Sequence, residues 1–155
     1  MAQGTLEWKM SRLGKATASR IFEIVDVDAR GAYKASRVNL LNELSMEIIT
    51  NEPTEKFVNS FMAEGTRQEP IARVAYMLEH DVDVEEVDLI DHPTIPRSGA
   101  SPDGLVDPDG FVEIKCRQMK YHIEFLTEPK IPPNYLCQIG WQFACMPERQ
   151  WCDYV

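Results

Sequence analysis

Residues 101–115 read Ser-Pro-Asp-Gly-Leu-Val-Asp-Pro-Asp-Gly-Phe-Val-Glu-Ile-Lys, and this stretch is the most informative part of the sequence for the fold and for the candidate chemistry. Its middle, residues 107–110, is a strong turn sequence, so we expect a β-hairpin that closes there. Because side chains alternate along a strand, Glu113 and Lys115 should project from one face. The same hairpin would bring Asp103 beside Glu113. Two carboxylates and an ammonium group would then converge.

This grouping has the chemistry of a metal site. Two acidic oxygen ligands suit a hard divalent cation such as Mg²⁺. A nearby lysine can steady an attacking water or the charge on a phosphate, which is how metal-assisted phosphodiester hydrolysis is built. The alternative is a surface hairpin with a simple Glu/Lys pair. However, Phe111, Val112 and Ile114 indicate that the second strand is buried. Charged side chains are rare in buried strands unless they are paired or bind a metal.

The composition is that of a globular protein. The chain has 155 residues, 44% of them hydrophobic and 26% charged, so we expect a single domain over residues 1–155. No apolar run approaches a membrane span, and residues 1–8 lack the core of a signal peptide. We therefore expect a cytoplasmic location and no membrane partner. The four cysteines form no CxxC pair, which gives little support to a zinc or iron–sulfur site.

The net charge of −9 does not by itself suggest DNA binding. Its distribution is uneven: residues 1–37 carry seven Lys or Arg against four acids, whereas residues 79–91 hold seven acids and no Lys or Arg. A basic N-terminal face and an acidic far side are compatible with an enzyme that grips DNA on one surface.

Hydrophobic periodicity predicts an α/β (α+β) fold with a mixed central β-sheet flanked by helices. We expect an entry loop at residues 8–14, followed by the helices and strands that carry the pattern. The expected helices are 21–25 (capped by Thr17 or Ser19), 35–50, 57–62 (capped by Thr54), 71–78, 118–127 and 135–145, and the expected strands are 82–87, 97–106, 111–116 and 151–155. The chain stops inside the last strand, so we interpret the domain as truncated at its C-terminus.

Pro102-Asp103, nine further residues and then Glu113-Ile114-Lys115 resemble the PD-(D/E)xK nuclease motif. Five segments together resemble a narrower group, the lambda-exonuclease-type or YqaJ-like viral recombinase nucleases. They are residues 8–19, 64–70, 101–104, 113–115 and 138–142, whose order and spacing fit that group over nearly the whole chain. The resemblance implies a restriction-endonuclease-like core. It also implies 5′-to-3′ hydrolysis of duplex DNA to 5′-mononucleotides, leaving a 3′ single strand for recombination by annealing.

The resemblance implies roles for the hairpin residues. Asp103 and Glu113 resemble metal ligands, with the backbone carbonyl of Ile114 as a further oxygen. Lys115 resembles the residue that orients or helps deprotonate the water. The implied cofactor is Mg²⁺, two ions per site, for which Mn²⁺ can substitute.

Two further residues are implied to complete the site. Glu69 resembles an acid on a preceding helix that acts through metal-bound water, although it could be an ordinary solvated helix glutamate. Gln138 resembles a glutamine that holds water or phosphate, although it could be a helix amide packed near the core.

The residues Arg12, Ser19 and Ser101 resemble a pocket for a 5′-phosphate. A guanidinium makes bidentate phosphate contacts and hydroxyls donate to free oxygens. Ser19 could also cap a helix, and Arg12 could be a solvated surface arginine. Trp8 could stack near the DNA end or belong to the core.

The implied partners are duplex DNA with a 5′-phosphorylated end, a homotrimer and a single-strand annealing protein. One alternative is another PD-(D/E)xK nuclease, such as an endonuclease or a repair-helicase nuclease domain. It would share Asp103, Glu113 and Lys115, and the phosphate-pocket residues argue for end recognition instead. A second alternative is a non-catalytic DNA-binding recombination protein, against which the intact acidic pair and lysine argue.

Overall fold

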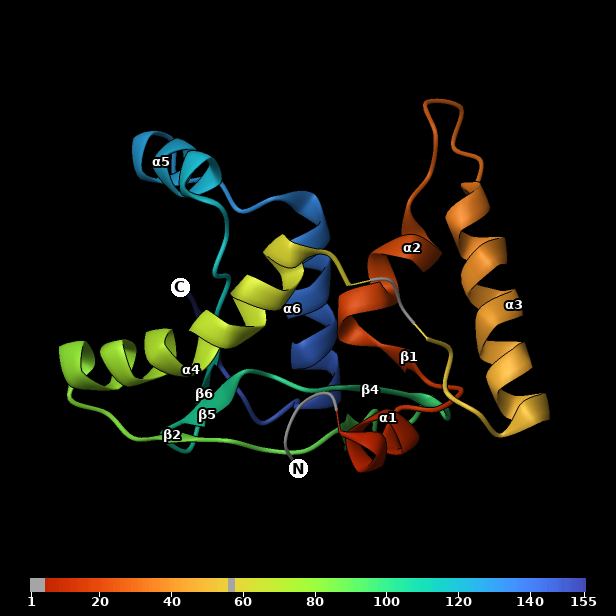
Figure 1. Cartoon of the computed structure of the whole chain (residues 1–155), viewed down its shortest axis with the longest axis horizontal. Coiled ribbons are helices and arrows are strands. Elements are labelled where there is room, and N and C mark those ends of the chain that lie inside the picture. Colours follow the sequence, from red (N-terminus) through yellow and green to blue (C-terminus); the bar gives the residue numbers. More distant parts are fainter. Residues whose placement is uncertain (1–4, 56–57) are drawn as a thin grey trace. The chain divides into compact units, whose positions relative to one another are not determined.

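The computed structural model describes residues 5–55 and 58–155 and has mixed α/β architecture (Figure 1). Its helices are α1 (Leu6–Ser11), the 3-10 turn η1 (Ala18–Arg20), α2 (Ile21–Val25), α3 (Ala35–Thr50), α4 (Ser60–His80), α5 (Met119–Thr127) and α6 (Pro133–Cys145). Its strands are β1 (Ala16–Thr17), β2 (Val84–Glu85), β3 (Ile90–Asp91), β4 (Ser98–Ala100), β5 (Gly104–Val106), β6 (Gly110–Glu113) and β7 (Trp151–Tyr154). The predicted fold class is confirmed. Within the two described ranges, no helix has both the length and the apolar character needed to cross a membrane.

The described chain divides into two compact units, and each has a β-sheet of its own. Residues 5–55, 87–101 and 134–147 form the first unit, and residues 58–86, 102–133 and 148–155 form the second. The first sheet has the order β1-β4-β3 and the second has the order β2-β5-β6-β7. Each sheet contains one parallel pair, so the strands are mixed as predicted, but in two sheets rather than one.

In the first unit, β1 runs parallel to β4 and β3 runs antiparallel to it. β4 is wholly buried, and a Cβ at Gly99 would lie 2.6 Å from the carbonyl oxygen of Ile90. Glycine is therefore required for this close approach. The register aligns Thr17 with Gly99, so the carboxyl ends of β1 and β4 lie at the same edge.

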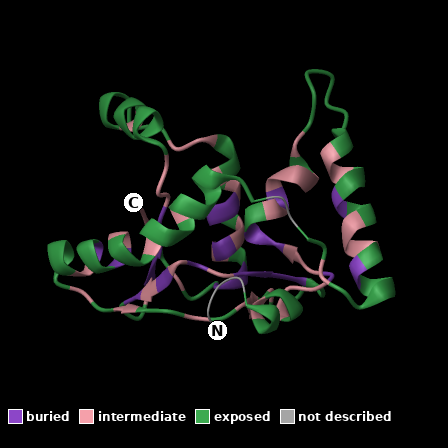
Figure 2. Ribbon diagram, viewed as in Figure 1, coloured by how far each residue is buried: buried purple, intermediate pink, exposed green. Residues whose placement is uncertain are grey.

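In the second unit, one face of the sheet packs against α4. The core cluster combines Tyr76 from α4 with Val106, Val112 and Ile114 from the sheet region. The Tyr76 hydroxyl also donates to Asp153 Oδ2 on β7, at 2.7 Å. Figure 2 shows how burial is distributed: the strands carry many of the buried residues, whereas much of α4 is exposed.

Two sequence-based assignments were wrong for clear reasons. Residues 8–14 were expected as a loop, but Leu6–Ser11 forms α1, whose first turn is capped by the Thr5 hydroxyl accepting from the Trp8 amide at 3.2 Å. Residues 97–106 were expected as one strand, but they form β4 and β5 in different sheets. Pro102 lies at the break and has no N–H to donate to a ladder.

The long helix α4 also differs from the prediction. It joins the two expected helices 57–62 and 71–78 and begins after Asn59, whose side chain caps the Met62 amide at 2.9 Å, rather than after Thr54. Phe57 lies outside the described residues. Pro70 sits in the helix interior, where it costs one backbone hydrogen bond that the remaining turns can tolerate.

The other main helices are confirmed, with α3, α5 and α6 close to the expected ranges 35–50, 118–127 and 135–145. The short strand β3 was not predicted.

Candidate active site

The β5–β6 hairpin brings two carboxylates together. Its register pairs Gly104 with Val112, which places Asp103, one residue before β5, opposite Glu113. Residues opposed in an antiparallel pair project to the same face. The Ile114 amide donates to Asp103 Oδ2 at 2.6 Å, which fixes this carboxylate against the end of β6. The predicted convergence of the two acids is confirmed.

Lys115 lies on the same side as Glu113, as the strand period predicted. The Lys115 ammonium forms an ion pair with Glu113 Oε1. Only 1% of the Glu113 side chain and 20% of the Lys115 side chain are exposed. The backbone there is braced by β7, since the Lys115 amide donates to the Val155 carbonyl at 2.8 Å and the Val155 amide donates to the Glu113 carbonyl at 3.0 Å.

The electrostatics of the hairpin favour a bound cation. Burial, and then the negative charge of Glu113, raise the pKa of Asp103 to about 7, while Lys115 acts in the opposite direction. A divalent cation would relieve this repulsion, and the two carboxylates with the Ile114 carbonyl are the hard oxygen donors it needs. Among residues 5–55 and 58–155, no three or more His, Cys, Asp or Glu side chains form a metal-holding cluster.

Glu69, on α4, is close enough to Glu113 and Lys115 to be affected by their charges. Its side chain is 18% exposed and forms an ion pair with Arg73, at 3.1 Å. Burial raises the pKa of Glu69; the nearby Arg73 and Lys115 charges lower it, and the Glu113 charge raises it. Glu69 is therefore not the ordinary solvated glutamate of the alternative interpretation. Arg73 was not singled out in the sequence, where its spacing of four residues from Glu69 was the available signal.

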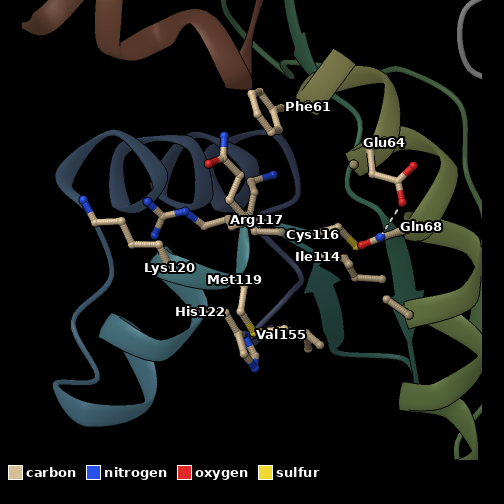
Figure 3. Close-up of a pocket in the computed structure, with 14 residues that line it drawn as sticks. Phe61, Glu64, Gln68, Ile114, Cys116, Arg117, Met119, Lys120, His122 and Val155 are labelled. Carbon is tan, nitrogen blue, oxygen red and sulfur yellow. Dashed lines mark hydrogen bonds between the residues drawn. The ribbon is translucent and has the colours of Figure 1, made fainter. Parts of the chain in front are cut away.

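A pocket of about 710 Å³ opens beside Lys115 (Figure 3). Positively charged Arg117 and Lys120 line it together with the apolar side chains of Phe61 and Met119. The segment that follows β6 thus presents cationic groups next to the hairpin. Sequence reasoning did not include these groups in the site.

Two of the predicted phosphate-binding residues meet in the first unit. Arg12 Nη1 donates to Ser101 Oγ at 2.8 Å, although 89 positions separate the two residues. The Arg12 guanidinium also lies over the Trp8 ring, 4.4 Å from its centroid. Burial lowers the pKa of Arg12 to about 10, so it remains charged at neutral pH. Arg12 is therefore an oriented, half-buried arginine rather than a solvated one.

Ser19 follows β1 closely, near the edge of the first sheet at which β1 and β4 end. It is exposed, and its hydroxyl is 3.5 Å from that of Thr17. In the described part of the chain, no side-chain hydrogen bond caps η1 or α2, so Ser19 does not have the capping role considered above. Ser19 and Ser101 each follow the aligned pair Thr17 and Gly99 by two residues, at the carboxyl ends of neighbouring parallel strands.

Gln138 lies in α6 of the first unit and is buried, with 9% exposed. Asp103, Glu113, Lys115 and Glu69 belong to the second unit. The structure therefore groups the four charged residues, and the role of Gln138 stays a prediction.

Comparison with known proteins gives a consistent result. The family model for the YqaJ-like viral recombinase domain matches residues 7–147. The crystal structure of an alkaline exonuclease, LHK-Exo from Laribacter hongkongensis, is similar with a TM-score of 0.87 and 44% identity, covering 97% of this chain and 73% of that one. The crystal structure of LHK-Exo in complex with dAMP is similar to the same extent, at 45% identity. No curated protein matched.

Proposed function

The chain belongs to the YqaJ-like viral recombinase domain family, and on this premise we propose that it is a lambda-exonuclease-type nuclease that resects linear double-stranded DNA from its 5′ end. It releases 5′-mononucleotides and leaves a 3′ single strand for recombination by single-strand annealing. The observation that carries the proposal is the hairpin register that sets Asp103 opposite Glu113, with Lys115 ion-paired beside them. The similarity to an alkaline exonuclease supports the same reaction class.

Asp103, Glu113 and the Ile114 carbonyl are the groups that we assign to hold Mg²⁺, two ions per site, with Mn²⁺ as a substitute. When bound, Mg²⁺ polarises the phosphate and lowers the pKa of the attacking water. Glu113 keeps the Lys115 ammonium beside the carboxylates through their ion pair. Lys115 then directs a water and offsets phosphate charge. Glu69 accepts hydrogen bonds from water at the edge of the site.

Arg12, Ser19 and Ser101 bind the 5′-phosphate in this proposal. The Arg12 guanidinium is already directed by the Ser101 hydroxyl and by the Trp8 ring, so little side-chain freedom is lost when a phosphate binds. Gln138 supplies an amide to water or phosphate. Only Pro102 separates Ser101 from Asp103 in the sequence, so end recognition and hydrolysis are assigned to neighbouring positions of the chain.

The proposed partners follow from the same family. They are duplex DNA with a 5′-phosphorylated end, two further copies of the chain in a homotrimer, and a single-strand annealing protein, all in the cytoplasm. Arg117 and Lys120 in the pocket beside Lys115 offer positive charge to the DNA backbone.

The decisive experiment uses linear duplex DNA that carries a 5′-phosphate on only one strand. With Mg²⁺, the phosphorylated strand should be degraded to mononucleotides while its complement stays intact, and a chelator should stop the reaction. Lys115→Ala serves as the inactive control, which excludes a contaminating nuclease. Loss of the unphosphorylated strand first would contradict the assigned polarity and end preference.

The other PD-(D/E)xK nucleases give a different result on closed circular DNA. An end-dependent exonuclease should leave a covalently closed plasmid intact, whereas an endonuclease would cut it at internal sites. Rapid cleavage of closed circles would therefore replace the present proposal with the endonuclease. A non-catalytic DNA-binding protein would degrade neither substrate in the presence of Mg²⁺.

A further inference from the structure

A buried arginine connects two acidic side chains in the second unit. Arg73 on α4 has 9% of its surface exposed. Its Nη2 donates to Glu69 Oε1 at 3.1 Å, and its Nη1 forms an ion pair with Glu86, the residue that follows β2. One guanidinium therefore links α4 to the end of a strand.

The two ends of this bridge differ in exposure. The side chains of Arg73 and Glu69 are 11% and 18% exposed, whereas that of Glu86 is 73% exposed. Glu69 is thus held by its neighbour one helical turn away, in the half-buried region that also feels the Glu113 and Lys115 charges. A planar guanidinium fixes the direction of its hydrogen bonds, and Glu86 restrains its other end.

We propose that Arg73 is a positioning residue of the nuclease, which holds the Glu69 carboxylate in the orientation needed beside the Asp103–Glu113–Lys115 group. The inference rests on the proposed function. Arg73 acts only through Glu69 and contacts neither DNA nor the reacting atoms. The ion pair with Glu86 restrains the Arg73 guanidinium, so this member of the acidic segment 79–91 also contributes to positioning.

A second ion pair on the same helix provides a matched control. Arg67 Nη2 pairs with Glu64 Oε1 at 2.7 Å, and their side chains are 66% and 47% exposed. This pair resembles that of Arg73 in chemistry and element but is open to solvent, where ion pairs contribute little. Arg67→Gln is therefore expected to leave kcat and KM unchanged.

The test is a double-mutant cycle on 5′-phosphorylated linear DNA. Arg73→Gln should lower kcat roughly 10- to 100-fold, the size of effect produced by small misplacements of catalytic groups, with KM nearly unchanged. In the Glu69→Gln background the same change should have no further effect on kcat. Arg73→Lys, which keeps the charge but not the planar fork, should restore part of the lost kcat.

Thermal unfolding of each variant separates positioning from folding. If Arg73→Gln does not fold, the cycle is run with Arg73→Lys, for which a smaller loss of kcat is expected and again only when Glu69 is present. Equal losses in the two backgrounds, or full activity of Arg73→Gln, would overturn the inference. Wild-type kcat in Glu69→Gln alone would instead remove Glu69 from the proposed site, and the inference with it.

Discussion

The charged form of the buried Asp103 carboxylate is electrostatically unfavourable in the absence of a cation. Asp103 has a pKa of about 7, first because it is buried and second because Glu113 lies opposite. Functional sites often carry such a cost, which a substrate or metal then relieves.

Asp103→Asn should therefore raise the thermal stability of the metal-free protein. We expect a gain of roughly 1–3 kcal/mol near pH 8, because a buried charge is removed while an oxygen remains to accept from the Ile114 amide. Mg²⁺ should stabilise the wild type by about 2.7 kcal/mol at a hundred times its dissociation constant, and should not stabilise the variant. Thermal unfolding with chelator and with Mg²⁺ measures both effects. Asp107→Asn, at an exposed turn position, is the control and should respond to Mg²⁺ like the wild type.

Lys115→Ala should abolish cleavage and largely preserve DNA binding. The ammonium is assigned to the water and the phosphate charge, so we expect a loss of about 10²- to 10⁴-fold in the cleavage rate. Single-turnover cleavage and a binding assay with chelator separate the two effects. Lys120→Ala, from the same pocket, should weaken binding more than cleavage. Turnover of Lys115→Ala at the wild-type rate would refute the assigned role.

Arg12→Ala should reduce the preference for 5′-phosphorylated over 5′-hydroxyl ends. We expect a drop of roughly tenfold or more in the ratio of the two cleavage rates, since a charge-assisted hydrogen bond is worth about 1.5–3 kcal/mol. The measurement is the ratio of initial rates on two otherwise identical duplexes. Arg37→Ala is the control, and it should leave the ratio unchanged. The Arg37 guanidinium lies 3.8 Å from the centroid of the Tyr33 ring, much as that of Arg12 lies over the Trp8 ring. An unchanged ratio in Arg12→Ala would leave Arg12 with a structural role only.

Side chains just before and at the start of β7 contact the turn of the β5–β6 hairpin. Arg149 Nη1 donates to the carbonyls of Asp107 and Gly110, at 2.8 and 3.1 Å. Trp151 Nε1 donates to Asp109 Oδ1 at 3.2 Å, and its ring covers Gly110. These contacts hold the turn of the hairpin, at the end opposite to the two carboxylates.

Gly110→Ala should disturb this arrangement. A Cβ there would lie 2.0 Å from the Trp151 ring, so the ring or the strand must shift, at a cost of about 1–3 kcal/mol in the free energy of unfolding. Gly140→Ala is the control, because no atom of residues 5–55 or 58–155 outside its own helical surroundings lies within 4 Å of the added Cβ, and the helix should gain roughly 0.5–1 kcal/mol. Denaturant unfolding measures both changes. Equal stability of the two variants would show that the ring contact is unimportant.

Local chemistry explains which elements could be predicted. The turn at residues 107–110 and the alternation after it were sufficient to place Asp103 beside Glu113, because a tight hairpin has few possible registers. The break at Pro102 was missed, since the sequence does not reveal that β4 and β5, on its two sides, have partners in different sheets. The contact of Arg12 with Ser101 joins distant positions, so no local pattern could reveal it, and it was expected only from the resemblance.

Across the whole chain, the distribution of charge is less polarised than the sequence suggests. Between described residues, three of the seven basic side chains in 1–37 form ion pairs with acids: Lys15 with Asp91, Arg20 with Glu23 and Glu43, and Lys34 with Asp26. The sequence count includes the full positive charge of these side chains, whereas in the folded protein neighbouring acids neutralise it. Part of the positive charge of residues 1–37 is therefore neutralised within the fold, so counting charges along the sequence overstates how basic this part of the protein is.

A homotrimer should be detectable as a mass three times that of the 17.7 kDa chain. On α4, the apolar side chains of Ile71, Val74 and Leu78 are 63%, 55% and 80% exposed and lie on one helical stripe. Such an uncovered stripe favours association. Light scattering over a range of concentrations gives the mass, with an unrelated monomer of similar size as reference. A mass of one chain at every concentration would contradict the trimer.

The parallel pairing of β6 with β7 has a consequence for how the nuclease matures. The two strands are joined through α5 and α6, so Glu113 acquires its neighbour Tyr154 only across a long stretch of chain. Contacts of such high sequence separation form late, because their loop-closure entropy must be overcome first. A nascent chain that has emerged only as far as Lys115 thus carries both carboxylates and the lysine without the strand that braces them. Competence to cut DNA is expected to arise only after synthesis has passed β7.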